Sequence, residues 1–161
     1  MTKLRCSLLV SILGLVASLS AQTASYTVQG TACAGSNGML PRISGDGVPS
    51  LGATMHVLLE DALPQVPAVM TVGASTSMWA GAPLPFDLGP AAAPGCLIYV
   101  SGERIFNLNV DGSGRARCPL NIPMNPALVG AKFFNQFLVA DRAANPLGVV
   151  TTACGMGVVG S

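Results

Sequence analysis

Residues 75–99 read STSMWAGAPLPFDLGPAAAPGCLIY, and this stretch constrains the fold more than any other part of the chain. It contains four prolines and three glycines, so neither a helix nor a central strand can run through it. It is nevertheless apolar, and it holds the only tryptophan, Trp79. We therefore predict a long ordered connection that lies across a core, anchored by Trp79 and Phe86 and pinned by Cys96.

The N-terminus has the pattern of a signal peptide. Two basic residues give a positive start, an apolar run covers residues 6–19, and small residues follow. The apolar run is short for a membrane-spanning helix. We predict cleavage after Ser20 or Ala21, with a signal peptide over residues 1–21 and one secreted domain over residues 22–161. The mature chain is expected to be extracellular or at the cell surface, with no membrane span.

Charged residues are scarce in this chain. They make up 9% of the sequence, against roughly 25% in ordinary soluble proteins. Removal of Lys3 and Arg5 with the signal peptide leaves six basic and seven acidic residues, which are scattered, so we predict no nucleic-acid partner. A surface this poor in charge is prone to association. We therefore expect contact with a cell-surface or matrix component, a polysaccharide or other copies of the chain.

Four cysteines remain after cleavage, and an even number in a secreted chain predicts two disulfides. Three connectivities are open. We favour a first bridge between Cys33 and Cys96, which would staple an N-terminal loop to the end of the proline-rich stretch. The second would join Cys118 to Cys154. No spacing forms a CxxC motif, so we predict neither a zinc site nor another cofactor.

The rest of the chain alternates between short runs of strand-forming residues and turn residues. The expected strands cover residues 25–29, 40–44, 54–60, 68–72, 97–101, 106–110, 115–122, 132–140 and 149–158. Asn125 followed by Pro126 predicts a single helical turn. About eight or nine short strands without a long helix are typical of an all-β fold, here a single antiparallel β-sandwich with long Pro/Gly-rich connections.

The clearest predicted hairpin turns at residues 111–114, which read DGSG. It would place four polar residues on one outer face: Asn107, Asn109, Arg115 and Arg117. That face is either solvated surface or a binding site. The segment from Asn107 has some features of a calcium loop, but Cys118 stands where a glutamate ligand is required, so we predict no metal there.

Five motifs follow one another along the chain. They are GTAC at residues 30–33, SMWAGAPLPFDL at 77–88, PGC at 94–96, LNIPMNPALVG at 120–130 and FNQFLVAD at 134–141. In this order they resemble a family of secreted β-rich modules that is common in planctomycete-type bacteria, often at the C-terminal end of longer extracellular proteins. The resemblance covers essentially the whole mature chain. It implies an extracellular, non-catalytic module and supplies no catalytic residue.

Catalytic chemistry finds little support in the sequence. His56 is the only histidine, and the chain has no Gly-x-Ser-x-Gly motif to provide a nucleophile beside it. The acidic residues are spread singly apart from Glu60 and Asp61, so no pair is marked for glycoside hydrolysis. We therefore predict that the protein is not an enzyme.

The aromatic residues have two interpretations. Trp79, Phe86 and Tyr99 could stack on sugar rings, or Trp79 and Phe86 could anchor the proline-rich stretch to the core. We predict a non-catalytic extracellular structural or adhesive module that contacts a cell surface, a matrix or itself. The alternative is a carbohydrate-binding β-sandwich domain, and an unrecognised secreted hydrolase ranks last.

Overall fold

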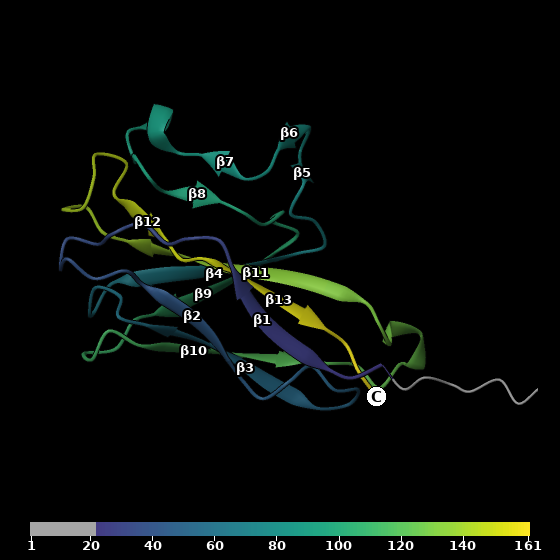
Figure 1. Ribbon diagram of the computed structural model, residues 1–161. Coiled ribbons are helices and arrows are strands. Elements are labelled where there is room, and N and C mark those ends of the chain that lie inside the picture. The colour runs from purple at the N-terminus through teal and green to yellow at the C-terminus, as the bar shows by residue number, and fades with distance from the viewer. Residues whose placement is uncertain (1–21) are drawn as a thin grey trace, which may run out of the picture.

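A computed structural model describes residues 22–161, so the predicted signal peptide lies outside the described residues. Two antiparallel sheets face each other, and a layer of loops and very short strands lies over the larger sheet (Figure 1). The all-β prediction is confirmed. Residues 22–161 form thirteen strands rather than the expected eight or nine, because three additional strands of two residues each form within the proline-rich stretch and the predicted strand over residues 149–158 is divided in two.

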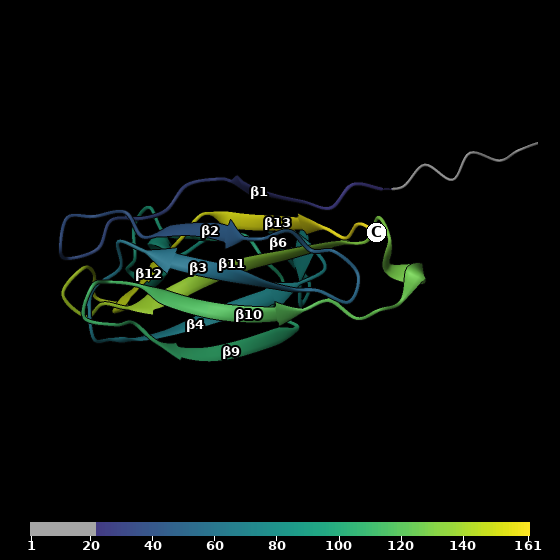
Figure 2. The same cartoon turned by 90° about the horizontal axis from the view of Figure 1, so that it is seen from below.

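The larger sheet has six strands, in the order β1-β13-β11-β4-β9, with β12 beside β11. These strands are β1 (Ser25–Gln29), β4 (Pro67–Gly73), β9 (Arg104–Asn109), β11 (Lys132–Ala140), β12 (Val149–Thr151) and β13 (Cys154–Val158). The smaller sheet has the order β10-β3-β2, formed by β10 (Ala116–Asn121), β3 (Thr54–Glu60) and β2 (Arg42–Asp46). Figure 2 shows the sheets face-on, with the smaller sheet in front and β1 and β9 at opposite rims of the larger sheet.

The core lies between the two sheets because each sheet turns alternate side chains toward the other. From β3 of the smaller sheet, Met55, Val57 and Leu59 are fully buried. Phe137 and Val139 of β11 in the larger sheet are also fully buried. The alternation of these three residues with more exposed ones along β3 therefore fixes which face of the strand meets the larger sheet.

Several sequence predictions match the observed elements. The bounds of β3 and β11 are those predicted, and β1 is confirmed. The predicted helical turn is the 3-10 helix η2 (Pro126–Leu128), whose N-cap Asn125 accepts a hydrogen bond from the Ala127 amide at 3.1 Å. The predicted closing strand over residues 149–158 is two strands, β12 and β13, because the chain breaks between them at Thr152 and Ala153.

The predicted hairpin around Asp111 is wrong. The turn is present, since the Asp111 carboxylate accepts hydrogen bonds from the Ser113 and Arg115 amides at 2.8 and 3.0 Å. However, β9 pairs with β4 in the larger sheet, whereas β10 pairs with β3 in the smaller sheet. The chain crosses the core at this turn rather than folding back beside itself. Turn chemistry fixes the local backbone but does not decide which sheet each strand joins: β9 stays largely exposed at the rim of the larger sheet, whereas β10 buries Cys118 in the core.

Candidate functional site

The proline-rich connection between β4 and β9, which we call the 74–103 segment, forms the third layer of the molecule (Figure 1). It contains β5 (Met78–Trp79), β6 (Ala82–Pro83), β7 (Phe86–Asp87), the 3-10 helix η1 (Gly89–Ala91) and β8 (Leu97–Ile98). β5 pairs with β6, and β7 with β8. The β5–β6 turn places Ala80 and Gly81 at φ of 47° and 84°, which is the two-residue turn that a tight hairpin requires.

A buried glutamine on the larger sheet holds this segment in place. Gln136 of β11 is fully buried, and its amide nitrogen donates hydrogen bonds to the carbonyl oxygens of Leu97 and Thr152, both at 2.8 Å. Its amide oxygen accepts a hydrogen bond from the Tyr99 amide at 2.9 Å. One side chain thus satisfies three backbone groups and ties the end of the segment to the sheet. Sequence reasoning missed Gln136; its only signal was its place, with Asn135, as one of two adjacent polar residues between apolar ones in the strand.

The predicted disulfide between Cys33 and Cys96 forms, with the Cα atoms 4.9 Å apart. It joins the segment to the N-terminal loop. Tyr99 adds a second link, because its hydroxyl accepts a hydrogen bond from the Thr31 amide at 3.0 Å. The ring of Tyr99 also packs so closely on Gly30 that a Cβ atom there would lie 2.7 Å from it. Tyr99 therefore positions the loop and is half-buried.

A small polar cluster closes the base of the segment, where it leaves β4 and enters β9. The Ser101 hydroxyl donates to the Glu103 carboxylate at 2.8 Å and accepts from the Ser75 amide at 3.0 Å. The Glu103 carboxylate also accepts from the Ala74 amide at 3.2 Å. The hydrogen bond from Ser101 is the main cause that holds the pKa of Glu103 below its ordinary value.

The aromatic residues of the segment face outward. Met78, Trp79 and Phe86 are 51%, 46% and 47% exposed, so the prediction that Trp79 and Phe86 anchor the segment to the core is wrong. Gln136 and the disulfide anchor the segment instead.

Trp79 and Phe86 both line one hollow of about 230 Å³, whose other lining residues are Ala80, Ala82 and Leu84. Tyr99 does not line this hollow. We call Met78 and the hollow together the Trp79 surface.

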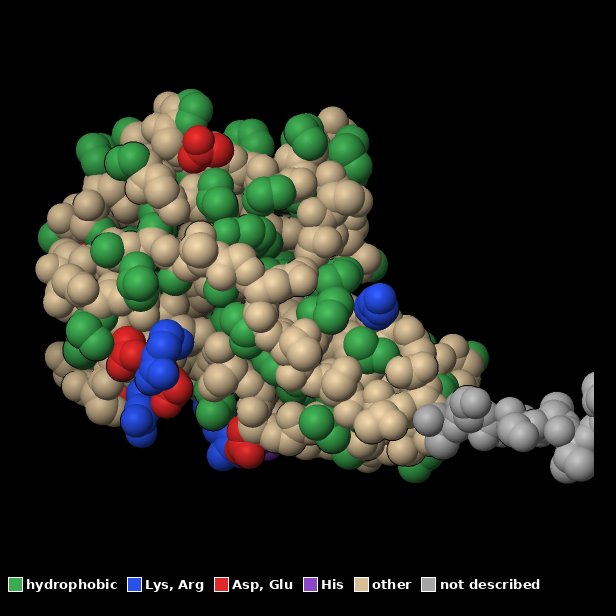
Figure 3. Space-filling model, viewed as in Figure 1, with side chains coloured by type: hydrophobic (Ala, Val, Ile, Leu, Met, Phe, Trp, Pro, Cys, Tyr) green, Lys and Arg blue, Asp and Glu red, His purple; other side chains and the backbone are tan. Residues whose placement is uncertain are grey.

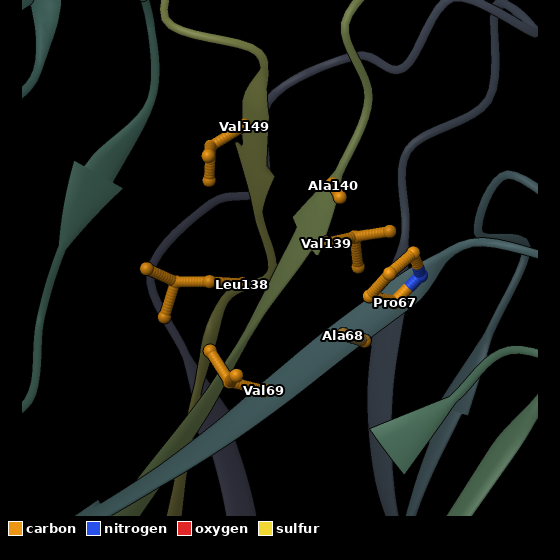
Figure 4. Close-up of a pocket in the computed structure, with 7 residues that line it drawn as sticks. All are labelled: Pro67, Ala68, Val69, Leu138, Val139, Ala140 and Val149. Carbon is orange, nitrogen blue, oxygen red and sulfur yellow. The ribbon is translucent and has the colours of Figure 1, made fainter. Parts of the chain in front are cut away.

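A second apolar hollow, also of about 230 Å³, lies where β4, β11 and β12 meet (Figure 4). The side chains of Val69, Leu138 and Val149 converge on one side of the strands, while Val139 points to the other. Val69 and Leu138 are register partners, so both lie on the outer face of the larger sheet. The hollow has no aromatic or charged lining residue. It therefore extends the apolar character of this face without adding a recognition group.

The polar residues that were expected on one hairpin face are divided between the two sheets. Asn107 and Asn109 lie exposed on β9. Arg115 and Arg117 lie beside the smaller sheet and form ion pairs there, Arg115 with Glu60 at 3.7 Å and Arg117 with Asp46 at 2.7 Å. Figure 3 shows charged side chains of both signs gathered low in the view, where the smaller sheet lies, and few around the 74–103 segment.

The predicted bridge between Cys118 and Cys154 is absent, and both residues are free buried thiols. Cys118 packs in the core from β10 of the smaller sheet. Cys154 begins β13 of the larger sheet, pairs with Gln29 of β1 and lies outside that core cluster. Burial raises the pKa of both thiols, that of Cys154 to about 11, so both are protonated and unreactive at neutral pH. The sequence could not show that Cys118 and Cys154 belong to strands of different sheets.

Groups for other chemistry are dispersed over residues 22–161. His56 is half-buried on β3, where its cross-strand partners are Asp46 and Pro119. No cluster of three or more histidine, cysteine or acidic residues that could hold a metal occurs within this range. No helix in the same range is long and apolar enough to cross a membrane.

Comparisons of the chain with protein-family models, with curated proteins and with solved structures found no match in any of the three. The resemblance to secreted β-rich modules therefore remains a hypothesis from sequence motifs.

Proposed function

We propose that this protein is a secreted, non-catalytic adhesive module that contacts a cell surface or an extracellular matrix through the Trp79 surface. One observation carries the proposal: Met78, Trp79 and Phe86 are about half exposed on a segment that is fixed to the sheet beneath it. Large apolar side chains in one exposed patch on a soluble fold mark a contact site. A rigid support lowers the entropy lost when such a patch binds.

Secretion is part of this proposal and has two supports. Residues 1–21 have the composition of a signal peptide. The disulfide between Cys33 and Cys96 forms and persists in an oxidising environment, which is the environment of extracellular proteins.

Carbohydrate binding is the second candidate, because Trp79 and Phe86 line the same hollow and aromatic faces stack on sugar rings. Sugar recognition also needs hydrogen-bonding groups near the stacking ring. The remaining lining residues, Ala80, Ala82 and Leu84, carry no polar side chain. The apolar lining favours an apolar surface patch on a macromolecule over a polysaccharide.

The test is retention of the mature, oxidised protein on insoluble polysaccharides and on cell envelopes of its producer. We expect retention on envelopes, with a loss of at least tenfold in Trp79→Ala and in Phe86→Ala. Met124→Ala is the matched control, because Met124 is 76% exposed and lies outside the 74–103 segment. Thermal unfolding of each variant reports whether it is folded.

Each result has a distinct meaning. Loss of envelope retention in Trp79→Ala, but not in Met124→Ala, supports the adhesive function. Specific retention on one polysaccharide, also lost in Trp79→Ala, favours the carbohydrate alternative. Equal retention of all folded variants contradicts both, because each requires the Trp79 surface.

A further inference from the structure

Strand β9 forms one rim of the larger sheet. It pairs with β4 on one side and, among the described strands, with none on the other. Figure 2 shows β9 as the outermost strand at this rim, with no other segment beyond it. A strand edge presents a row of backbone donors and acceptors that can pair with another chain.

The pairing register identifies which residues of β9 present these groups. The Val110 amide donates to the Val66 carbonyl oxygen at 2.9 Å, so this pair is hydrogen-bonded. Bonded and non-bonded pairs alternate in an antiparallel ladder. The backbone groups of Ile105, Asn107 and Asn109 therefore point away from β4. Asn109 provides a check, since its partner is Pro67, which has no amide hydrogen to donate to it.

The side chains of β9 do not protect this edge. Ile105 and Phe106 are 62% and 36% exposed. Natural edge strands are usually blocked by proline, lysine or a bulge, and β9 has none of these. Its only charged residue is Arg104, at one end. The free edges of the smaller sheet differ, because β10 contains Pro119 and β2 carries Arg42 and Asp46.

We propose that two copies of this chain associate through β9, with the strands antiparallel about a two-fold axis that passes beside Asn107. In this register Asn107 faces its symmetry mate, and Ile105 faces Asn109 of the second copy. All three outward-pointing residues of each strand then lie in hydrogen-bonded pairs, and the two larger sheets become one continuous sheet.

The side chains fit the same register. Phe106 lies opposite Leu108 of the second copy in a non-bonded pair, where side chains approach most closely. Both residues are on the inner face of the sheet, and Leu108 already packs against the core. The exposed ring of Phe106 would thus extend the core across the interface. Arg104 lies opposite Val110 of the second copy, so no like charges face each other within the paired strands.

Strand β1, the other rim of the larger sheet, is the competing edge. It is shorter than β9, and its side chains are mostly polar, with Val28 the one exposed large apolar residue. Tyr26 of β1 also packs inward over Gly45 of β2, where a Cβ atom would lie 2.7 Å from the ring. The proposal is independent of the Trp79 surface, which lies on the 74–103 segment rather than on β9.

The first test is the mass in solution of the mature, oxidised protein by light scattering over a range of concentrations. We expect twice the monomer mass at high concentration. Asn107→Pro removes an outward amide donor while leaving the bonded pairs of β9 with β4 in place, so it should give a monomer with an otherwise native melting curve. Ile105→Lys blocks the edge by charge and gives the same expected result should the proline variant fail to fold.

Oxidative cross-linking tests the register. Asn107→Cys should form a disulfide-linked dimer, because the two residues face each other at the axis. Ile105→Cys should not, since its symmetry mate is displaced by four positions along the strand. Thr27→Cys on β1 is the matched control for the competing edge. A monomeric wild-type protein at all concentrations, an Asn107→Pro variant that stays dimeric, or cross-linking at Thr27 instead of Asn107 would overturn the proposal.

Discussion

The outer faces of the two sheets differ in whether they carry ion pairs. The outer face of the smaller sheet carries arginines and carboxylates in ion pairs, including Arg117 with Asp46 and Arg42 with Asp61 at 2.6 Å. The outer face of the larger sheet carries an apolar hollow and the uncharged polar side chains of Gln136 and Asn107, and the 74–103 segment covers part of it (Figure 1). The four ion pairs of the described residues thus all lie at the smaller sheet. Under the proposed function, the smaller sheet faces solvent and the layer over the larger sheet makes the contacts.

The largest expected effect comes from separating the segment from the N-terminal loop. The pair of substitutions Cys33→Ala and Cys96→Ala should destabilise the protein by about 4 kcal/mol, because the bridge closes a long loop in the unfolded chain. Chemical denaturation of the variant against the oxidised wild type measures this loss. Reduction of the wild type should reproduce it. An unchanged unfolding midpoint would mean that the bridge contributes nothing to the layered structure.

The next effect comes from removing the support of the segment on the sheet. Gln136→Ala should cost about 3 kcal/mol, because it leaves buried backbone groups without hydrogen-bond partners. The neighbouring residue provides the comparison. Asn135 is also fully buried, but its side chain has one partner, the Tyr26 hydroxyl at 2.6 Å. Asn135→Ala should therefore cost less. Equal losses would show that the bonds of Gln136 to the segment are not what distinguishes it.

Acid should loosen the base of the segment through Glu103. Its pKa is lowered in the folded protein, so the carboxylate contributes stability above its unfolded value of about 4.3, and that contribution is lost as pH falls through the folded value. Protease cleavage within residues 74–103 should accelerate over this acidic window. Glu103→Gln should flatten the pH dependence. An unaltered acid response in this variant would assign the effect to another carboxylate.

The smallest effect is expected on the charged face. Arg117→Ala breaks an ion pair whose two side chains are each 57% exposed, so it should cost less than about 1 kcal/mol. Thermal unfolding at low and high salt measures the cost and its screening. Envelope retention should stay at the wild-type level. A large loss of retention in Arg117→Ala would place the contact surface on the smaller sheet and reverse the comparison between the two faces.

The strands were predictable wherever one face alternates into the core. Met55, Val57 and Leu59 mark β3 by their spacing alone, and Asn125 with Pro126 marks the 3-10 turn. Which strands pair was not predictable. The residues of β9 and β10 fit a hairpin as well as a crossing between sheets, and only the long-range packing of the whole chain decides between them.

Only part of the candidate site could be predicted from the sequence. The composition of residues 75–99 showed an ordered connection, and Cys33 with Cys96 gave one of its attachments. The orientation of Trp79 could not be read from the sequence, because an aromatic residue in an apolar stretch fits a core or a surface equally well. The role of Gln136 could not be predicted either, because its three hydrogen bonds are to backbone groups that are distant from it in the sequence.

The most direct test of the proposed contact surface is the accessibility of Trp79, the only tryptophan, to iodide before and after the protein binds cell envelopes. We predict ready quenching of Trp79 fluorescence in the free protein, because the side chain is about half exposed. We predict strong protection of Trp79 from iodide in the bound protein. Met124→Ala should behave as the wild type. Unchanged quenching in protein that is demonstrably bound would contradict the claim that the 74–103 segment is the contact surface.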